Sequence, residues 1–422
     1  MRALLRIPRL RTKLLFTVLA VLLYRVGQNV PSPGVDVAAL REAAAAAVRD
    51  DPMYALLDLL TGGGLPHLSV LGLGVLPHVA ASAAMRLLVP ASPRLRALAA
   101  ETGGAARLRR YTTVLAVALG AAAGTAVAVA AAQRDVLTGP GPVAVAATLT
   151  AGTAITAGLI RLVSARGFDD GLAVLFFTQV CAVFPGLLWD VRETRGAGTF
   201  IAALAAVLLT ALLTVAALIA LTQAERRVPV QHARRRVRLH APKGAYIPVP
   251  LHRSGLRSVL TALVLLHLPA LAARLWPGGG VPDGVWTAPR HDDARFLLAL
   301  LALAALARAV SPAGVLDVPG TTNLLVREDA FVPGVRPGPP TAGYLSYVRS
   351  RVTAPTPLVL GPIAVLPSTT LALAGVDMPV LGVCVLIVLG AGLGPVTRTV
   401  KRATVDRTLH EFAPHLPASA AR

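Results

Sequence analysis

Charged, aromatic and cysteine residues are all scarce in this chain. Charged residues occupy 15% of its 422 positions and aromatic residues 4%, while 55% of the residues are hydrophobic. Soluble domains carry about 25% charged residues, because their surfaces must be solvated. The shortage of charge therefore excludes a soluble globular protein and indicates a membrane protein.

Metal, redox and nucleotide motifs are also missing from the sequence. The two cysteines, Cys181 and Cys384, lie far apart in different apolar segments and neither belongs to a CxxC pair. We therefore expect both to be small packing residues. No GxxxxGK[ST] sequence occurs in the chain, so no P-loop is expected. We expect no cofactor, no metal site and no catalytic residues, and any energy must come from a partner or from the membrane potential.

Apolar sequence is abundant and falls into ten segments of about bilayer length. They lie at about 14–30, 75–89, 111–132, 142–163, 171–189, 199–222, 256–275, 294–310, 355–375 and 379–397. This pattern predicts an all-α polytopic membrane protein with ten transmembrane helices. No small-residue cleavage site follows the first segment, so we expect it to remain as a helix.

The formal net charge of +20 is distributed in a way that predicts topology. With both termini in the cytoplasm and the ten segments alternating, 32 of the 41 lysines and arginines face inward. Only 9 of the 21 acidic residues do so, which gives +23 inside and −3 outside. This positive-inside pattern predicts a multi-pass protein of the cell membrane whose N-terminus and C-terminus are cytoplasmic, with basic loops near anionic lipids.

The apolar stretch Leu56–Leu88 is too long and too broken to be one spanning helix. Its helix breakers are Gly62, Gly63, Gly64, Pro66, Gly72, Gly74 and Pro77. Non-helical backbone at membrane depth must be buried in protein or line a water-filled cavity. The stretch therefore predicts a re-entrant piece and a hinge, then a helix from about Val75 to Val89, near a pore or a substrate path.

Motifs in four places match those of one known family. The first comprises Ile7, Pro8, Leu10, Arg11, Lys13 and Thr17, then Arg25, Gly27, Pro31, Pro33, Gly34, Val35 and Asp36; the second has LLDL at 56–59, then Gly62, Gly63, Ser69, Leu73, Gly74 and Pro77; the others are AERRVPVQHARR at 224–235 and AFVPGVRPGPPTAGYL at 330–345. Together they resemble bacterial SecY, the channel subunit of the Sec protein translocon. The chain departs from the family pattern at Gly64, Pro66, His78, Asp169, Asp170 and 252–254.

The resemblance implies a specific fold. The ten helices would form two inverted-repeat halves, 1–190 and 191–422. A re-entrant plug would lie at about 58–74, and large cytoplasmic loops at about 224–255 and 311–354. Prolines and glycines at 333–340 predict a stiff, non-helical tip that presents Arg336 to a partner.

The same resemblance implies three groups of site residues. The plug would include Gly62, Gly63, Leu65, Leu68 and Leu71. An apolar pore ring, which seals by excluding water, would consist of Val79, Ala83, Leu172, Phe176, Leu260 and Ile387. Partner docking would use Arg226, Arg227, Arg234, Arg235 and Arg336.

The function implied is that of the central channel subunit of the protein translocase. It would pass unfolded preproteins across the cytoplasmic membrane and release apolar segments laterally into lipid, without enzymatic activity. The expected partners are SecE-like and SecG-like small membrane subunits, the SecA motor ATPase, the ribosome, signal peptides with unfolded preproteins, and anionic lipids.

Two alternatives stay open at this point. The departures would also suit a divergent SecY paralogue with restricted cargo, and inverted repeats with broken helices also occur in secondary transporters for small solutes. An intramembrane enzyme would rest on the His78 and Ser82 pair alone, which we interpret as a satisfied polar pair. Arg25 and Gln28 are expected to reach the outer interface by snorkelling.

Overall fold

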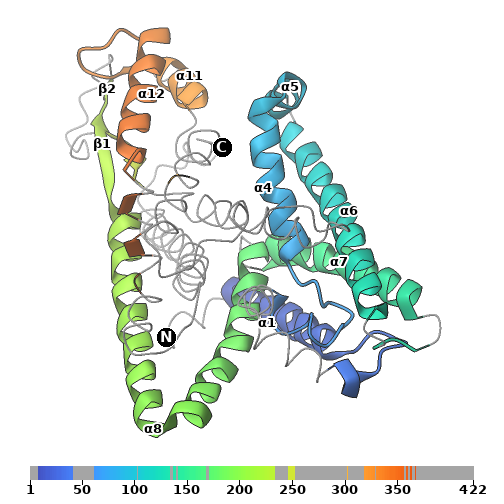
Figure 1. Ribbon diagram of the computed structural model, residues 1–422. Coiled ribbons are helices and arrows are strands. Elements are labelled where there is room, and N and C mark those ends of the chain that lie inside the picture. Colours follow the sequence, from blue (N-terminus) through green and yellow to red (C-terminus); the bar gives the residue numbers. More distant parts are fainter. Residues whose placement is uncertain are drawn as a thin grey trace. The chain divides into compact units, whose positions relative to one another are not determined.

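The computed structural model describes somewhat under three fifths of the chain, in several stretches (Figure 1). These are residues 8–40, 61–101, 103–133, 136–138, 141–167, 171–232, 246–251, 318–327 and 329–355, with isolated positions between 302 and 366. The described residues of Met1–Val75 and Val127–Phe184 belong to one compact unit, and those of Leu76–Ala126 and Pro185–Leu386 to a second.

Helices occupy most of the described chain. They are α1 (Pro8–Asn29), α4 (Leu76–Ala91), α5 (Pro93–Ala100), α6 (Gly104–Ala132), α7 (Gly141–Arg166) and α8 (Gly171–Gln223). Within the described part, three helical stretches are long and apolar enough to cross a membrane: Gly104–Ala132, Gly141–Arg166 and Gly196–Leu221. Each overlaps an apolar segment found in the sequence, as expected where apolar length determines the helix.

Gly196 divides α8 into two helical parts. Its φ of 86° is non-helical and is a conformation that glycine adopts without a Cβ penalty. The two apolar segments predicted at 171–189 and 199–222 lie on either side of this kink. The short α5 was not predicted, although Pro93 at its first turn, after Ser92 at the N-cap position, is a usual helix start.

In the first unit, α1 packs against α7. Between α1 and α4 the chain runs through a series of turns from Gly62 to Val75 and becomes helical only at Leu76. The sequence had predicted a helix start at about Val75. We refer to the non-helical stretch with Thr61 as the 61–75 segment.

In the second unit, the regions that follow α8 form a small mixed subdomain. It contains the strands β1 (Glu225–Pro229), β2 (Gln231–His232), β3 (Tyr246–Pro250) and β4 (Ala330–Phe331), and the helices α11 (Val318–Arg327) and α12 (Pro339–Thr353). β1 pairs with β3, and β2 pairs with β4, both antiparallel. We call this group the loop subdomain, because it joins the two loops expected at about 224–255 and 311–354.

Proline positions explain how the loop subdomain is built. Pro248 and Pro250 are tolerated in β3 because a two-stranded sheet leaves each strand one free edge. Pro339 stands at the start of α12, where a missing N–H costs nothing. The expectation that Pro339 and Pro340 belong to a non-helical tip was therefore wrong: the tip ends at Gly338, which has a φ of 97°.

Candidate functional site

The 61–75 segment is tied to the end of α1 by backbone hydrogen bonds. The amides of Val70 and Leu71 donate to the carbonyls of Val30 (2.8 Å) and Gly27 (3.0 Å). The Ser32 amide donates in turn to the Leu68 carbonyl at 3.0 Å. Because lipid offers no hydrogen bonds, these pairs satisfy backbone that a helix would otherwise satisfy internally.

Small residues allow this segment to approach the helices closely. A Cβ placed on Gly152 of α7 would overlap the carbonyl of Val70, and one on Gly27 would lie 2.5 Å from the Leu71 side chain. Leu71 and Leu68 are 4% and 3% exposed. Leu68 also packs with Leu40, Ala131 and Val136 in an apolar cluster.

The plug residues expected from the sequence all lie in this segment. Gly62 and Gly63 have φ values of 73° and 80°, in the region that favours glycine. Leu65 is half-buried, whereas Leu68 and Leu71 are buried. The structure thus places these five residues in one packed, non-helical stretch, while its movement as a plug stays a prediction.

Two polar side chains of α1 hold the beginning of this segment. Gln28 donates through Nε2 to the Thr61 carbonyl at 2.8 Å, and Arg25 donates through Nη1 to the Gly62 carbonyl at 3.1 Å. The expected snorkelling of Gln28 to the outer interface is wrong, since Gln28 is 2% exposed. The carbonyls of Thr61 and Gly62 are buried and need hydrogen-bond donors. Meeting this need stabilises the protein more than contact of the side chains with the interface would.

The pore-ring residues that the structure describes form two pairs. Val79 and Ala83 lie one turn apart on α4, and both are buried. Leu172 and Phe176 lie one turn apart on α8, where Phe176 is 2% exposed and Leu172 is half-buried. Residues four apart share a helix face, so each pair can act as a unit. Leu260 and Ile387 lie outside the described residues, and the ring as a whole stays a prediction.

His78 and Ser82 on α4 do not bond to each other, so the interpretation of these two residues as a satisfied polar pair was wrong. The Ser82 hydroxyl donates to the Val79 carbonyl at 2.9 Å, within its own helix. A nucleophilic pair would need this hydroxyl to donate to His78 instead.

Cys181 is exposed on α8, so the expectation that it packs as a small buried residue was wrong. Among the described residues there is no cluster of three or more His, Cys, Asp or Glu side chains that could bind a metal.

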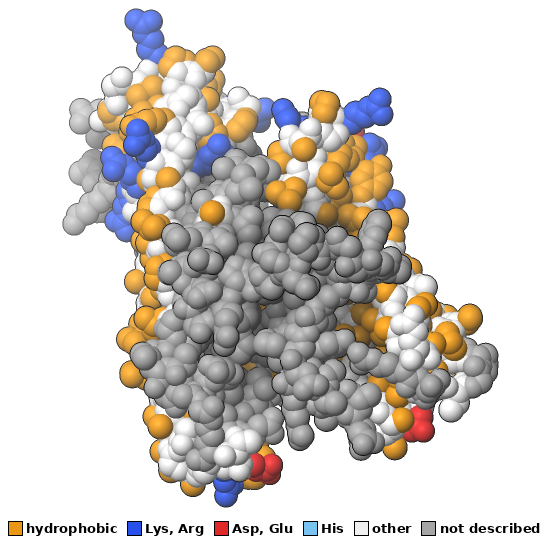
Figure 2. All heavy atoms as spheres, in the orientation of Figure 1, with side chains coloured by type: hydrophobic (Ala, Val, Ile, Leu, Met, Phe, Trp, Pro, Cys, Tyr) orange, Lys and Arg blue, Asp and Glu red, His pale blue; other side chains and the backbone are white. Residues whose placement is uncertain are grey.

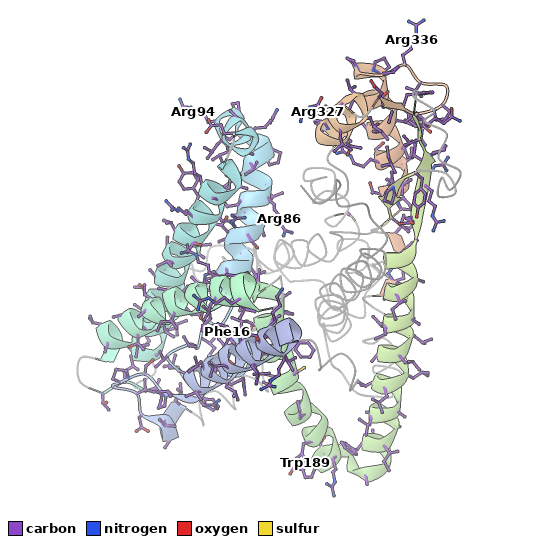
Figure 3. The ribbon with its side chains drawn as sticks, turned by 180° about the vertical axis from the view of Figure 1, so that it is seen from behind. Phe16, Arg86, Arg94, Trp189, Arg327 and Arg336 are labelled. Carbon is purple, nitrogen blue, oxygen red and sulfur yellow. The ribbon has the colours of Figure 1, made fainter. Side chains whose placement is uncertain are left out.

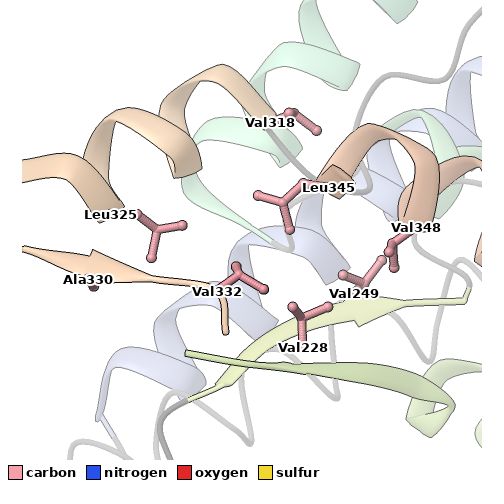
Figure 4. Close-up of a cluster of buried hydrophobic side chains, with 8 residues drawn as sticks. All are labelled: Val228, Val249, Val318, Leu325, Ala330, Val332, Leu345 and Val348. Carbon is pink, nitrogen blue, oxygen red and sulfur yellow. The ribbon is translucent and has the colours of Figure 1, made fainter. Parts of the chain in front are cut away.

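The loop subdomain has its own apolar core (Figure 4). Its buried members are Val228, Val249, Val318, Leu325, Ala330, Val332, Leu345 and Val348. They come from β1, β3, β4, the turn after it, α11 and α12, so residues about a hundred positions apart in sequence share one core. The core makes the two loops a rigid platform rather than two independent segments.

Basic side chains project from this platform. Arg336 is exposed on the turn after β4, and Figure 3 shows it pointing away from the subdomain. Thr341 donates to the Arg336 carbonyl at 2.7 Å, which fixes the backbone of the turn. The space-filling view shows further lysine and arginine side chains, coloured blue, on the surface of the loop subdomain (Figure 2).

Two more of the predicted docking residues lie on β1. Arg226 and Arg227 are both exposed. The Arg227 guanidinium pairs with Glu225 at 3.1 Å and lies 4.8 Å from the centre of the Tyr246 ring. Arg227 is therefore held in place, partly neutralised, beside Arg226. Arg234 and Arg235 lie outside the described residues.

Replacing Leu345 by alanine is expected to destabilise the loop subdomain. Leu345 is fully buried at 0% exposure, and such a truncation typically costs about 2–5 kcal/mol because it leaves a cavity. Limited proteolysis in detergent, followed at 224–251 and 318–353, measures the effect. Leu324→Ala is the matched control, because Leu324 on α11 is 54% exposed. Equal resistance of the two variants would contradict the role of this core.

Taken together, these features define a polytopic α-helical membrane protein with a packed non-helical segment between two of its helices and a basic platform built from two loops. The chain matches the SecY family model over residues 69–394. It is 34% identical to the protein translocase subunit SecY of Streptomyces scabiei, over 92% of this chain and 93% of that protein. The Mycobacterium tuberculosis subunit is 32% identical, over 97% and 98%. The chain belongs to the SecY family.

Solved structures show the same fold. A protein-conducting channel superposes with a TM-score of 0.66 at 14% identity, covering 97% of this chain and 95% of that one. The yeast Ssh1 complex, in the idle state and bound to the 80S ribosome, gives a TM-score of 0.63 at 14% identity, covering 92% and 89%. At this identity the likeness establishes the fold alone. It agrees with the channel fold expected from the sequence.

Proposed function

We propose that this chain is the central channel subunit of a protein translocase in the cell membrane. The observation that carries the proposal is its 34% identity, over 92% of its length, to a protein named as a translocase subunit. In this role it passes unfolded preproteins across the membrane and releases their apolar segments laterally into lipid. It performs no chemistry itself, in keeping with a sequence that contains no P-loop.

The channel in this proposal is closed by two elements. The 61–75 segment is the plug, and the apolar ring of Val79, Ala83, Leu172, Phe176, Leu260 and Ile387 excludes water. The halves 1–190 and 191–422 would move apart to open a path to lipid. The burial of Val79, Ala83 and Phe176 supports this assignment, because a seal needs apolar groups that are packed away from water.

The loop subdomain is the docking surface in this proposal. Its exposed arginines attract acidic protein surface or the phosphates of ribosomal RNA. A SecA-like motor or a ribosome would therefore bind there, with SecE-like and SecG-like subunits in the membrane. This arrangement requires the loops and both termini to be cytoplasmic, as the positive-inside pattern predicts.

Complementation tests the general-export form of this function. A bacterial strain depleted of its own SecY should regain growth and secretion when this chain and its small partner subunits are expressed. Failure to rescue, with the protein present in the membrane at normal levels, would contradict general export.

A further inference from the structure

We propose that Arg25 and Gln28 of α1, with Gln179 of α8, form a polar latch that holds both ends of the 61–75 segment and sets how often the idle channel opens. The inference rests on the proposed function, since opening has a meaning only for a channel. All of these residues belong to the first compact unit. The name polar latch refers below to these three side chains.

The first part of the latch binds two consecutive backbone carbonyls. Gln28 Nε2 donates to Thr61 at 2.8 Å, and Arg25 Nη1 donates to Gly62 at 3.1 Å. Thr61 and Gly62 begin the segment and are buried. Buried carbonyls need a donor from the protein, and the two side chains provide the hydrogen bonds that water would otherwise supply. The bond from a guanidinium is charge-assisted and stronger than a neutral one.

The two donors are coupled to each other. Arg25 Nη1 also donates to Gln28 Oε1 at 2.8 Å, which orients the Gln28 amide so that its Nε2 faces Thr61. The same Nε2 lies 3.3 Å from the hydroxyl of Tyr24, which is 0% exposed. A buried network of hydrogen bonds like this one stabilises the structure more than the sum of its separate bonds, and removing one member weakens the others.

Gln179 packs against the other end of the segment as well as its beginning, without a hydrogen bond to either. A Cβ placed on Gly62 would lie 2.8 Å from Gln179 Cγ, and one placed on Gly74 would overlap the Gln179 amide. Gln179 is 0% exposed. The beginning and the end of the segment therefore both pack against the Gln179 side chain. Glycine is required at both positions, because the φ values of Gly62 and Gly74 are 73° and 55°.

The latch can be removed without touching the middle of the segment. There the amides of Val70 and Leu71 bind backbone carbonyls of Val30 and Gly27, which no side-chain substitution deletes. Loss of the latch should thus release the ends of the segment while its middle stays attached to α1. This predicts local opening rather than global unfolding.

Hydrogen exchange of the full-length protein in lipid nanodiscs, together with ion conductance of the idle channel in vesicles, tests the proposal. Gln28→Met keeps the size of the side chain but removes the donor to Thr61. A buried acceptor left without its donor favours opening by roughly tenfold. We expect peptides covering 61–75 to exchange about tenfold faster, with α7 peptides unchanged, and the idle conductance to rise in parallel.

Gln28→Glu is a second variant for the case in which Gln28→Met folds poorly. Its carboxylate can still pair with Arg25 but cannot donate to Thr61, so faster exchange at 61–75 is again expected. Asn29→Leu is the matched control: Asn29 is exposed and donates within α1, to the Arg25 carbonyl at 2.8 Å. Its exchange and conductance should equal those of the wild type.

Unchanged exchange at 61–75 in both Gln28 variants would overturn the latch. Faster exchange with an unchanged idle conductance would overturn its link to channel opening. Neither result depends on preprotein transport, so failure of the latch is distinct from failure of the proposed function, which is tested by transport alone.

Discussion

Arg336→Glu should abolish motor-stimulated transport while the protein still inserts and folds. Arg336 is exposed on the turn that follows β4, and its side chain takes no part in the core of the loop subdomain. Reversing its charge therefore costs little stability but places a carboxylate against an acidic partner. Loss of one interfacial charge pair weakens binding by about 2 kcal/mol or more, which is roughly 30-fold in affinity.

The measurement is ATP-dependent transport of a preprotein into vesicles, at several motor concentrations, together with direct binding of the motor. Arg192→Glu is the charge-matched control, because Arg192 is also exposed but lies on α8, next to Trp189. It should transport normally. Unchanged motor-driven flux in the Arg336 variant would remove the docking role from this residue.

Phe176→Asn should make the idle channel leak ions. Phe176 is 2% exposed and lies one turn from Leu172 on α8. An apolar constriction seals because water leaves it, and a polar side chain lets water stay. In the dry, closed constriction the asparagine would be buried without a hydrogen bond, which costs about 1–3 kcal/mol. The hydrated, open state is therefore favoured, and its population rises roughly 5- to 150-fold.

Single-channel or vesicle conductance without a motor or preprotein measures this effect. Phe177→Asn is the matched control, because the neighbouring Phe177 is 41% exposed and points to a different face of α8. It should leave the seal intact. Equal conductance for the two variants would show that Phe176 is not part of the seal.

Much of the helical framework could be predicted from the sequence because apolar length alone determines it. The segments at 111–132 and 142–163 lie within α6 and α7, and the helix expected from about Val75 begins at Leu76. The breakers of the 61–75 segment were equally readable, since glycine at positive φ cannot continue a helix.

The loop subdomain was not predictable in the same way. Its strands β2 and β4 are two residues each and pair across about a hundred positions. Such short strands carry no periodic pattern, and their pairing depends on contacts that are distant in sequence. The arginine-rich motifs identified the surface, but not that a common core joins the two loops.

The polar contacts of α1 escaped prediction for a related reason. A glutamine near the end of an apolar segment usually reaches the interface, and the sequence does not reveal that two carbonyls of another segment need donors. Gln28 is buried because Thr61 lies opposite it, 33 positions away in the chain. The signal in the sequence that could have identified this contact is a pair of polar residues within an apolar segment that precedes a glycine-rich break.

Reconstituted transport tests the central claim most directly. The purified chain, with its small membrane subunits, is placed in vesicles and supplied with an unfolded preprotein, a SecA-like motor and ATP. The account predicts that the preprotein becomes protected from external protease only when both motor and ATP are present. No protected preprotein under these conditions, or motor-independent uptake of a small solute instead, would contradict it.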